Sequence, residues 1–123
     1  MMRRDRAIDG EWQVTPAGRR RRRKRQADAG IALFAEKFPA AFYVDGFAER
    51  RPLKLGIDHD LQKLLKIKRY LIKTTLRFYC NSFSYLGSMY PGAVRVDLNG
   101  QPAGVVTEEE AAMAQQQLEK LAA

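Results

Sequence analysis

The sequence predicts a mostly helical fold with a β-hairpin near the C-terminus and a final helix. Apolar residues recur with a helical period across residues 59–79 and, more briefly, across residues 26–38. Asn99-Gly100 lies between two short runs of alternating polarity, which is typical of a hairpin turn. Thr107-Glu108-Glu109-Glu110 is a capping box, a pattern that begins helices. With 123 residues, the chain has room for one domain and a tail.

The first predicted helix begins at Gln26 and ends before Pro39. Its apolar face would consist of Ile31, Leu33, Phe34 and Phe38. Residues 1–28 are polar and contain an unbroken basic run: Arg19, Arg20, Arg21, Arg22, Arg23, Lys24 and Arg25. Like charges this close repel one another, so we expect residues 1–28 to form a flexible basic tail and residues 29–123 to form the folded domain.

The basic run of the tail has two interpretations. It could be an arm that binds phosphates without sequence preference, or a leader that only keeps the chain soluble. We favour the arm. Attraction to a membrane surface would produce the same sequence pattern.

Residues 59–79 are predicted to form one central helix, capped by Asp58. At about 100° per residue, one broad face of this helix is apolar. A separate narrow stripe is cationic and contains no acid: Lys66, Arg69, Lys73 and Arg77. A surface that needed only solubility would mix the two signs of charge. The stripe therefore predicts phosphate binding, with a solvated helix face as the alternative.

A short helix is expected to begin at Asn81 or Ser82, because either side chain can cap it. The free N–H groups of a helix N-terminus attract anions, so this helix start is a candidate anion site. Residues 94–98 and 102–106 are the two predicted strands. We expect a type I′ turn at Asn99-Gly100, and Pro102 indicates an edge strand.

The stretch from Arg50 to Arg95 combines positive charge with aromatic rings. It contains ten Lys or Arg and two acidic residues, a net charge of +8, whereas residues 96–123 have a net charge of −4. Its tyrosines and phenylalanines lie between the basic residues. Cations neutralise phosphates and rings stack on bases, so this composition predicts a nucleic-acid partner.

Other function classes are not expected. A single cysteine, Cys80, cannot form an internal disulfide or a zinc site by itself, and it is consistent with a reducing cytoplasm. The one histidine, His59, has no second histidine or nucleophile near it in sequence, so we expect it to be exposed and expect no enzyme, cofactor or metal site. We also expect no membrane span and no secretory leader.

A series of short motifs occurs in a fixed order between about Ile31 and Leu121. They are Phe38-Pro39 with Phe42, Arg51-Pro52-Leu53-Lys54-Leu55-Gly56-Ile57, Leu76-Arg77-Phe78-Tyr79, Phe83-Ser84-Tyr85-Leu86, and the run from Pro91 to Gly104. No single motif is specific. Together, in this order, they resemble the FinO/ProQ family of bacterial RNA chaperones over roughly three-quarters of the chain.

The resemblance implies a small α+β domain with a basic concave face that binds structured RNA in post-transcriptional regulation. The implied ligands are small regulatory RNAs and messenger 3′ regions, each with a stem-loop followed by a single-stranded 3′ end, as at a terminator hairpin. It implies no small-molecule substrate, and we expect a monomer.

The resemblance also assigns residues by position. Tyr85 and Arg95 fall in the RNA-binding pocket of the family, and Lys54 falls on the same face. Tyr85 would offer a ring and a donor, and Arg95 a bidentate fork. The alternative for Tyr85, and the favoured interpretation for Tyr79, is a core aromatic residue.

Further positions match the central helix and the helix that follows it. Arg69 and Lys73 fall on basic positions, and Asn81 with Ser82 matches the polar helix start that holds the 3′-terminal nucleotide. This chain is shorter here than the longer family members and lacks their Ser or Asn helix cap. The assignments of Arg69 and Lys73 therefore depend on where the gap is placed.

Two alternatives remain open from the residues alone. A DNA-binding module should present a helix with base-reading Arg, Asn or Gln, and the cationic stripe has no Asn or Gln. A basic ribosome-associated structural protein would share the RNA partner.

Overall fold

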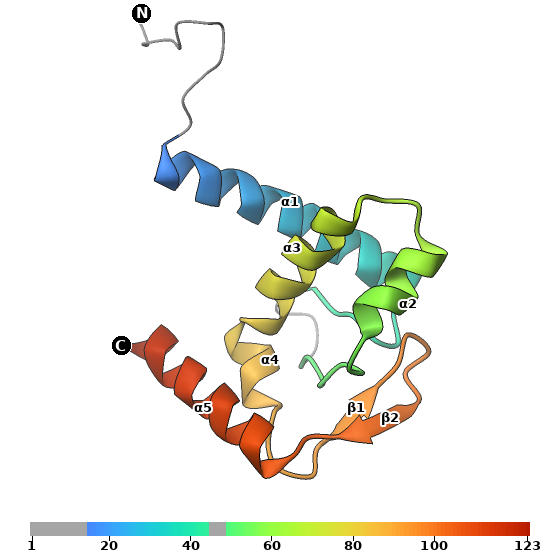
Figure 1. Cartoon of the computed structure of the whole chain (residues 1–123), viewed down its shortest axis with the longest axis vertical. Helices are drawn as coiled ribbons and strands as arrows, with labels where there is room; N and C mark the ends of the chain where they lie inside the picture. Colours follow the sequence, from blue (N-terminus) through green and yellow to red (C-terminus); the bar gives the residue numbers. More distant parts are fainter. Residues whose placement is uncertain (1–14, 45–48) are drawn as a thin grey trace, which may run out of the picture.

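The computed structural model describes residues 15–44 and 49–123, so residues 1–14 of the predicted tail lie outside the described residues. In these residues the chain forms α1 (Pro16–Lys37), α2 (Ile57–Leu64), α3 (Arg69–Cys80), α4 (Phe83–Gly87), β1 (Val94–Val96), β2 (Pro102–Val105) and α5 (Glu108–Ala122). Figure 1 shows α1 and α2 beside α3, α5 beside α4, and the hairpin of β1 and β2 at the lower right of the view. The predicted fold class, mostly helical with a hairpin and a final helix, is confirmed.

The first helix begins ten residues earlier than predicted, at Pro16 rather than Gln26. The hydroxyl of Thr15 caps it by accepting a hydrogen bond from the Gly18 N–H at 2.9 Å, and Pro16 occupies the first turn. Arginine has a high helix propensity, which here outweighs the repulsion between neighbouring charges. The basic run is therefore part of α1, and the predicted boundary at residue 28 falls inside this helix.

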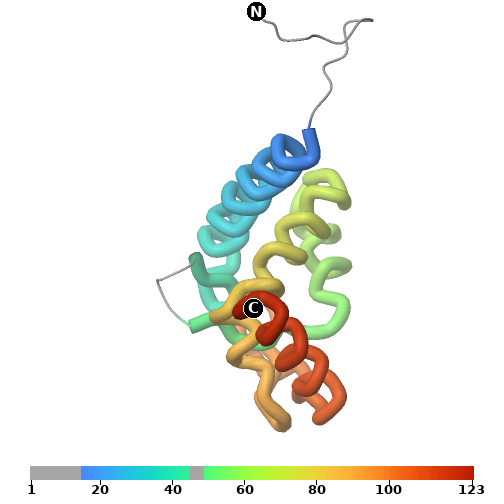
Figure 2. Tube along the Cα trace, turned by 90° about the vertical axis from the view of Figure 1, so that its left-hand side faces the viewer, coloured from blue at the N-terminus to red at the C-terminus, as the bar shows by residue number. Residues whose placement is uncertain are grey.

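Helix α1 packs against α3 through the C-terminal half of its length. Its buried residues are Ala27, Ile31 and Phe34. Figures 1 and 2 both show α1 lying alongside α3, and in Figure 1 the N-terminal turns of α1 extend beyond it. The basic run from Arg19 to Arg25 lies on these turns and is exposed throughout.

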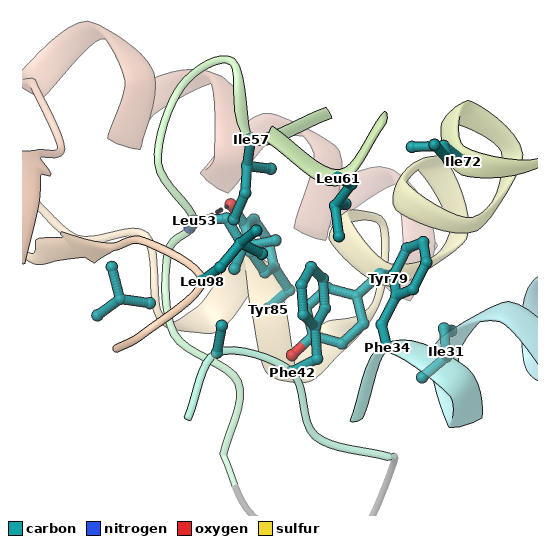
Figure 3. Packing of buried hydrophobic residues seen from close by; sticks show 12 residues of the cluster. Ile31, Phe34, Phe42, Leu53, Ile57, Leu61, Ile72, Tyr79, Tyr85 and Leu98 are labelled. Atoms are coloured by element: carbon teal, nitrogen blue, oxygen red, sulfur yellow. Dashed lines mark hydrogen bonds between the residues drawn. The ribbon is translucent and has the colours of Figure 1, made fainter. Parts of the chain in front are cut away.

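The core is built around a row of aromatic rings. Ring centroids are 5.1 Å apart for Phe34 and Phe42, 5.0 Å for Phe42 and Tyr79, and 5.9 Å for Tyr79 and Tyr85. Figure 3 shows these rings in contact with aliphatic residues from the surrounding elements. Tyr79 is fully buried, which confirms the prediction that it is a core residue.

The single central helix predicted over residues 59–79 is wrong, because two helices with a non-helical connection occupy this region. Leu65 has an extended backbone (φ −110°, ψ 136°), and Lys68 is extended immediately before α3. The extended connection lets both Leu65 and Ile67 pack against the core, which a continuous helix face would not allow. Neither helix has the predicted cap: α2 follows the left-handed Gly56, with Asp58 inside its first turn.

The hairpin pairs β1 with β2 antiparallel, and residues 52–54 add a short parallel bridge on the other side of β1. The predicted type I′ turn is wrong, because that turn needs positive φ at Asn99 and among the described residues only glycines have it. Instead the Gly100 N–H donates to the Asp97 carbonyl at 2.9 Å. The capping box at Thr107 is confirmed as the start of α5.

Candidate nucleic-acid interface

An open hollow of about 430 Å³ lies between α3, β1 and the segment that leads into α2. Five of the residues predicted to bind RNA line it together: Lys54, Lys73, Arg77, Tyr85 and Arg95. We call this space the α3–β1 hollow. Its remaining lining is largely apolar and backbone, from Leu53 to Asp58, Leu76 and Cys80.

The backbone of Leu53 joins the two side chains predicted to form the pocket. Its N–H donates to the Tyr85 hydroxyl oxygen at 3.0 Å, and its carbonyl accepts from Arg95 Nη1 at 2.7 Å. Leu53 is held in place by its bridge to Val96 on β1. Tyr85 on α4 and Arg95 on β1 are therefore fixed relative to each other through one residue of the family motif.

Tyr85 is both a core residue and part of the hollow wall. Only 6% of it is exposed, and it contacts the core cluster seen in Figure 3. Burial raises the pKa of its phenol far above the ordinary value, so the hydroxyl stays protonated at neutral pH. Tyr85 is therefore mostly a core aromatic residue, as the alternative interpretation held, but part of its side chain also lines the hollow.

Arg95 is a buried cation, with 4% of its surface exposed. Besides Leu53, its guanidinium contacts the carboxylate of Glu110 on α5, with 3.0 Å between Nη2 and Oε1. Its Nε is buried and has no hydrogen-bond partner among the described residues. A buried donor without a partner is uncommon in folded proteins.

The cationic stripe is retained on α3 by three residues. Arg69, Lys73 and Arg77 follow one another at four-residue intervals, and all three are exposed. The fourth, Lys66, is exposed but lies in the connection before α3, so it does not share the helix face as predicted. Lys54 also lines the hollow, and its Nζ forms an ion pair with Asp60 Oδ2 at 2.7 Å.

Asn81 and Ser82 do not line the α3–β1 hollow. Ser82 caps α4 as predicted, accepting a hydrogen bond from the Tyr85 N–H at 3.2 Å. Its hydroxyl also donates to the Tyr79 carbonyl and accepts from Arg50 at 2.9 Å. Asn81 is exposed at the C-terminal end of α3. Ser82 therefore contacts Tyr85 through the backbone but is not part of the wall of the hollow.

The sequence did not predict two residues that hold neighbouring parts of the site in place, Arg50 and Glu110. Arg50 is buried, with its guanidinium 4.1 Å from the centre of the Tyr79 ring and Nε donating to the Tyr43 carbonyl at 3.1 Å. It therefore fixes the junction between α3 and α4. In the sequence, nothing distinguishes Arg50 from the basic residues around it. The capping box alone explains Glu110, so the sequence did not indicate its contact with Arg95.

The cysteine of the hollow and the single histidine were also considered in the sequence as candidate reactive or metal-binding groups. Burial raises the pKa of the Cys80 thiol to about 11, so it is not a reactive thiolate at neutral pH. His59 is exposed, as predicted. Within residues 15–44 and 49–123 there is no group of three or more potential metal ligands. No helix in that part of the chain has the length and apolar character needed to cross a membrane.

A second hollow of about 750 Å³ lies on the other side of the extended segments. Pro52 and Val94 line it, whereas their neighbours Leu53 and Arg95 line the first, because successive side chains of an extended chain point to opposite faces. None of the predicted RNA-binding residues lines this second hollow.

Comparison with known proteins identifies similar sequences. The pattern of the ProQ/FINO family matches residues 24–123. The RNA chaperone ProQ of Alteromonas mediterranea is 44% identical over 94 residues, which cover 73% of this chain and 41% of that protein. The RNA chaperone ProQ of Haemophilus influenzae is 43% identical over 96 residues, covering 75% and 48%. The chain thus spans less than half the length of these curated relatives.

Solved structures share the fold as well. An NMR solution structure of a ProQ homolog from Legionella pneumophila is 31% identical, with a TM-score of 0.67, and the match covers 76% of this chain and 81% of that one. The crystal structure of a FinO-like RNA chaperone from Neisseria meningitidis is 33% identical, with a TM-score of 0.62 and 80% of each chain covered. By sequence and by fold, this chain belongs to the ProQ/FinO family.

Proposed function

We propose that this chain binds structured RNA and acts as an RNA chaperone. The observation that carries the proposal is the convergence of cations and an aromatic edge on one hollow: Lys54, Lys73, Arg77, Arg95 and Tyr85. Such a site favours a polyanionic ligand. The similar proteins are named RNA chaperones, which supports RNA as the polyanion.

The α3–β1 hollow would hold the 3′-terminal nucleotide of the RNA. A volume of about 430 Å³ suits a small ligand, and a single nucleotide has that character. The guanidinium of Arg95 would donate to a ribose or phosphate oxygen, and the edge of Tyr85 would contact the sugar or base. A duplex end with a short single strand can reach such a site, whereas bases inside an A-form stem cannot.

The cationic side of α3 would bind the stem. Arg69, Lys73 and Arg77 lie about 6 Å apart along the helix axis, and all are exposed to solvent. Lys66, exposed in the connection between α2 and α3, would contribute a further phosphate contact. Lys73 and Arg77 also line the hollow. A stem on α3 and its 3′ end in the hollow would therefore be continuous.

Two further regions would contribute less specific contacts. The exposed arginines on the first turns of α1 would bind phosphates without sequence preference. Asn81 is exposed just after Cys80, which lines the hollow, so it could contact the strand at the entrance. The Ser82 hydroxyl is already used by Arg50 and Tyr79, and we expect Ser82 to contribute by holding α4.

The test is a binding titration with RNA hairpins that differ only at the 3′ end. We expect tightest binding to a stem with a short single-stranded tail ending in a free hydroxyl. A 3′-phosphate or removal of the tail should weaken binding by about tenfold or more, since buried polar groups would lose their partner. Equal affinity for all three RNAs would contradict the end-recognition proposal.

A matched DNA hairpin tests the nearest rival. We expect weaker binding to DNA, because the 2′-hydroxyl and A-form geometry distinguish RNA. Equal binding would favour a general nucleic-acid-binding protein.

We propose that the ligands are small regulatory RNAs and messenger 3′ regions in the bacterial cytoplasm, where Cys80 would stay reduced. Cross-linking in the cell and sequencing of the bound RNA would test this.

A further inference from the structure

Arg95 reaches the α3–β1 hollow with its orientation fixed from two sides. Nη1 donates to the Leu53 carbonyl at 2.7 Å, and Nη2 pairs with Glu110 Oε1 at 3.0 Å. Only 5% of the Arg95 side chain is exposed. The one guanidinium nitrogen left without a partner among the described residues is Nε. The position of the guanidinium at the wall of the hollow is thus determined by Leu53 and Glu110, and each terminal nitrogen still has a second N–H group.

The same Glu110 oxygen has a second task. Oε1 accepts the N–H of Thr107 at 2.9 Å, while the Thr107 hydroxyl accepts the N–H of Glu110 at 3.1 Å. This capping box fixes the first turn of α5, and the Arg95 contact ties that turn to β1. The Thr107 N–H and then Arg95 hold the pKa of Glu110 below its ordinary value, so the carboxylate is charged at neutral pH.

We propose that Glu110 is a positioning residue for RNA binding: it holds the Arg95 guanidinium in place at the wall of the α3–β1 hollow. This inference rests on the proposed function, because it assumes that RNA occupies the hollow. It adds a role for α5, none of whose residues lines that hollow. An acidic residue would thereby assist the binding of a polyanion.

The direction in which RNA affinity changes when Glu110 is removed distinguishes positioning of Arg95 from a simple charge effect. If Glu110 acted only through its charge, replacing it with alanine would remove repulsion and tighten RNA binding slightly. If it positions Arg95, Glu110→Ala should bind the hairpin with a free 3′ tail about tenfold more weakly. A hairpin without the tail should bind as well as before, because it does not use the hollow.

Two matched variants separate the alternatives. Glu109→Ala removes the same charge from the same exposed helix turn, and the described residues show no contact of Glu109 with Arg95. It should leave binding of both hairpins unchanged or slightly tighter. Thr107→Ala breaks the cap but spares the ion pair, so it should lower the melting temperature without altering the preference for the 3′ tail.

The double variant Arg95→Ala/Glu110→Ala completes the test. If Glu110 acts through Arg95, the double variant should bind no more weakly than Arg95→Ala alone. The inference is overturned if Glu110→Ala binds like Glu109→Ala, if it loses affinity for both hairpins equally, or if its loss persists without Arg95. Normal binding by Arg95→Ala would instead contradict the proposed site itself. The two failures are thus distinguishable.

Discussion

Gly30 on α1 lies directly against Thr75 on α3. A Cβ atom added at Gly30 would be 2.1 Å from Thr75 Oγ1, closer than any real contact, and Thr75 is buried. The absence of a side chain at Gly30 therefore sets how closely the two helices approach. This approach brings the core residues Ile31 and Phe34 of α1 against the remainder of the aromatic row.

Replacing Gly30 with alanine should destabilise the fold. Alanine is the better helix former, which favours the substitution by about 1 kcal/mol. The clash with Thr75 should outweigh this gain and lower the free energy of unfolding by about 1–3 kcal/mol net. Urea unfolding measures the change.

The matched control for Gly30 is Gly87→Ala. A Cβ at Gly87 meets nothing within 4 Å, so this change should be neutral or slightly stabilising. Thr75→Ala removes the clashing oxygen and should recover part of the loss in the double variant. A Gly30→Ala protein as stable as the original would show that α1 and α3 can separate without cost.

The exposed cations of α3 should set the salt dependence of RNA binding. Arg77→Ala should weaken binding of the tailed hairpin and reduce the slope of log affinity against log salt by about one, as expected for one lost phosphate contact. Lys120→Ala, an equal charge change at the exposed C-terminal end of α5, is the control. An equal change of slope in both variants would mean that only net charge matters.

Stability should fall at alkaline pH because of Tyr79. Burial raises the pKa of its phenol from 10.0 to about 12, so above pH 10 the unfolded chain releases this proton while the folded chain keeps it. The stability linked to Tyr79 is complete below pH 10 and is lost as the pH rises toward 12. Unfolding free energies measured across this range should fall less steeply for Tyr79→Phe.

Tyr90→Phe is the control for this pH effect, because it removes an exposed phenol of the same kind. Its pH profile should match that of the original protein. Cys80, whose pKa burial raises from 9.0 to about 11, adds a loss that begins at lower pH. Tyr85, whose pKa burial also raises, adds a further loss above pH 10. The comparison of Tyr79→Phe should therefore be made with Cys80 and Tyr85 present in both proteins. Identical slopes for Tyr79→Phe and the original would contradict the assigned cause.

The elements that were predicted correctly depend on local chemistry. Thr107 and Glu110 form the capping box of α5, and Ser82 caps α4, because these bonds join residues three positions apart. The family motifs also brought Tyr85 and Arg95 to one hollow. Such features can be predicted because the residues that determine them are neighbours in the sequence or in a shared motif.

The errors arose where distant contacts decided the structure. The break between α2 and α3 lets both Leu65 and Ile67 pack against the core. Residues 65–68 contain no glycine or proline that would indicate a helix end in the sequence. The break moved Lys66 off the helix that carries Arg69. The sequence suggests that Arg50 is a surface cation, but it is buried against the ring of Tyr79 on α3, which is distant in the sequence. Hydrophobic periodicity contains no information on such partners.

The arginines of α1 should increase affinity for every RNA alike. They lie on exposed turns that extend beyond α3 in Figure 1 and contribute no residue to the α3–β1 hollow. Deleting residues 1–28 would also remove the buried Ala27, so substitution is the better test. Replacing Arg20, Arg21 and Arg23 with glutamine, which has a similar helix propensity, should preserve α1. Affinities for tailed and tail-less hairpins should fall by the same factor, leaving their ratio unchanged. A change in that ratio would mean that the basic run helps to select the 3′ end.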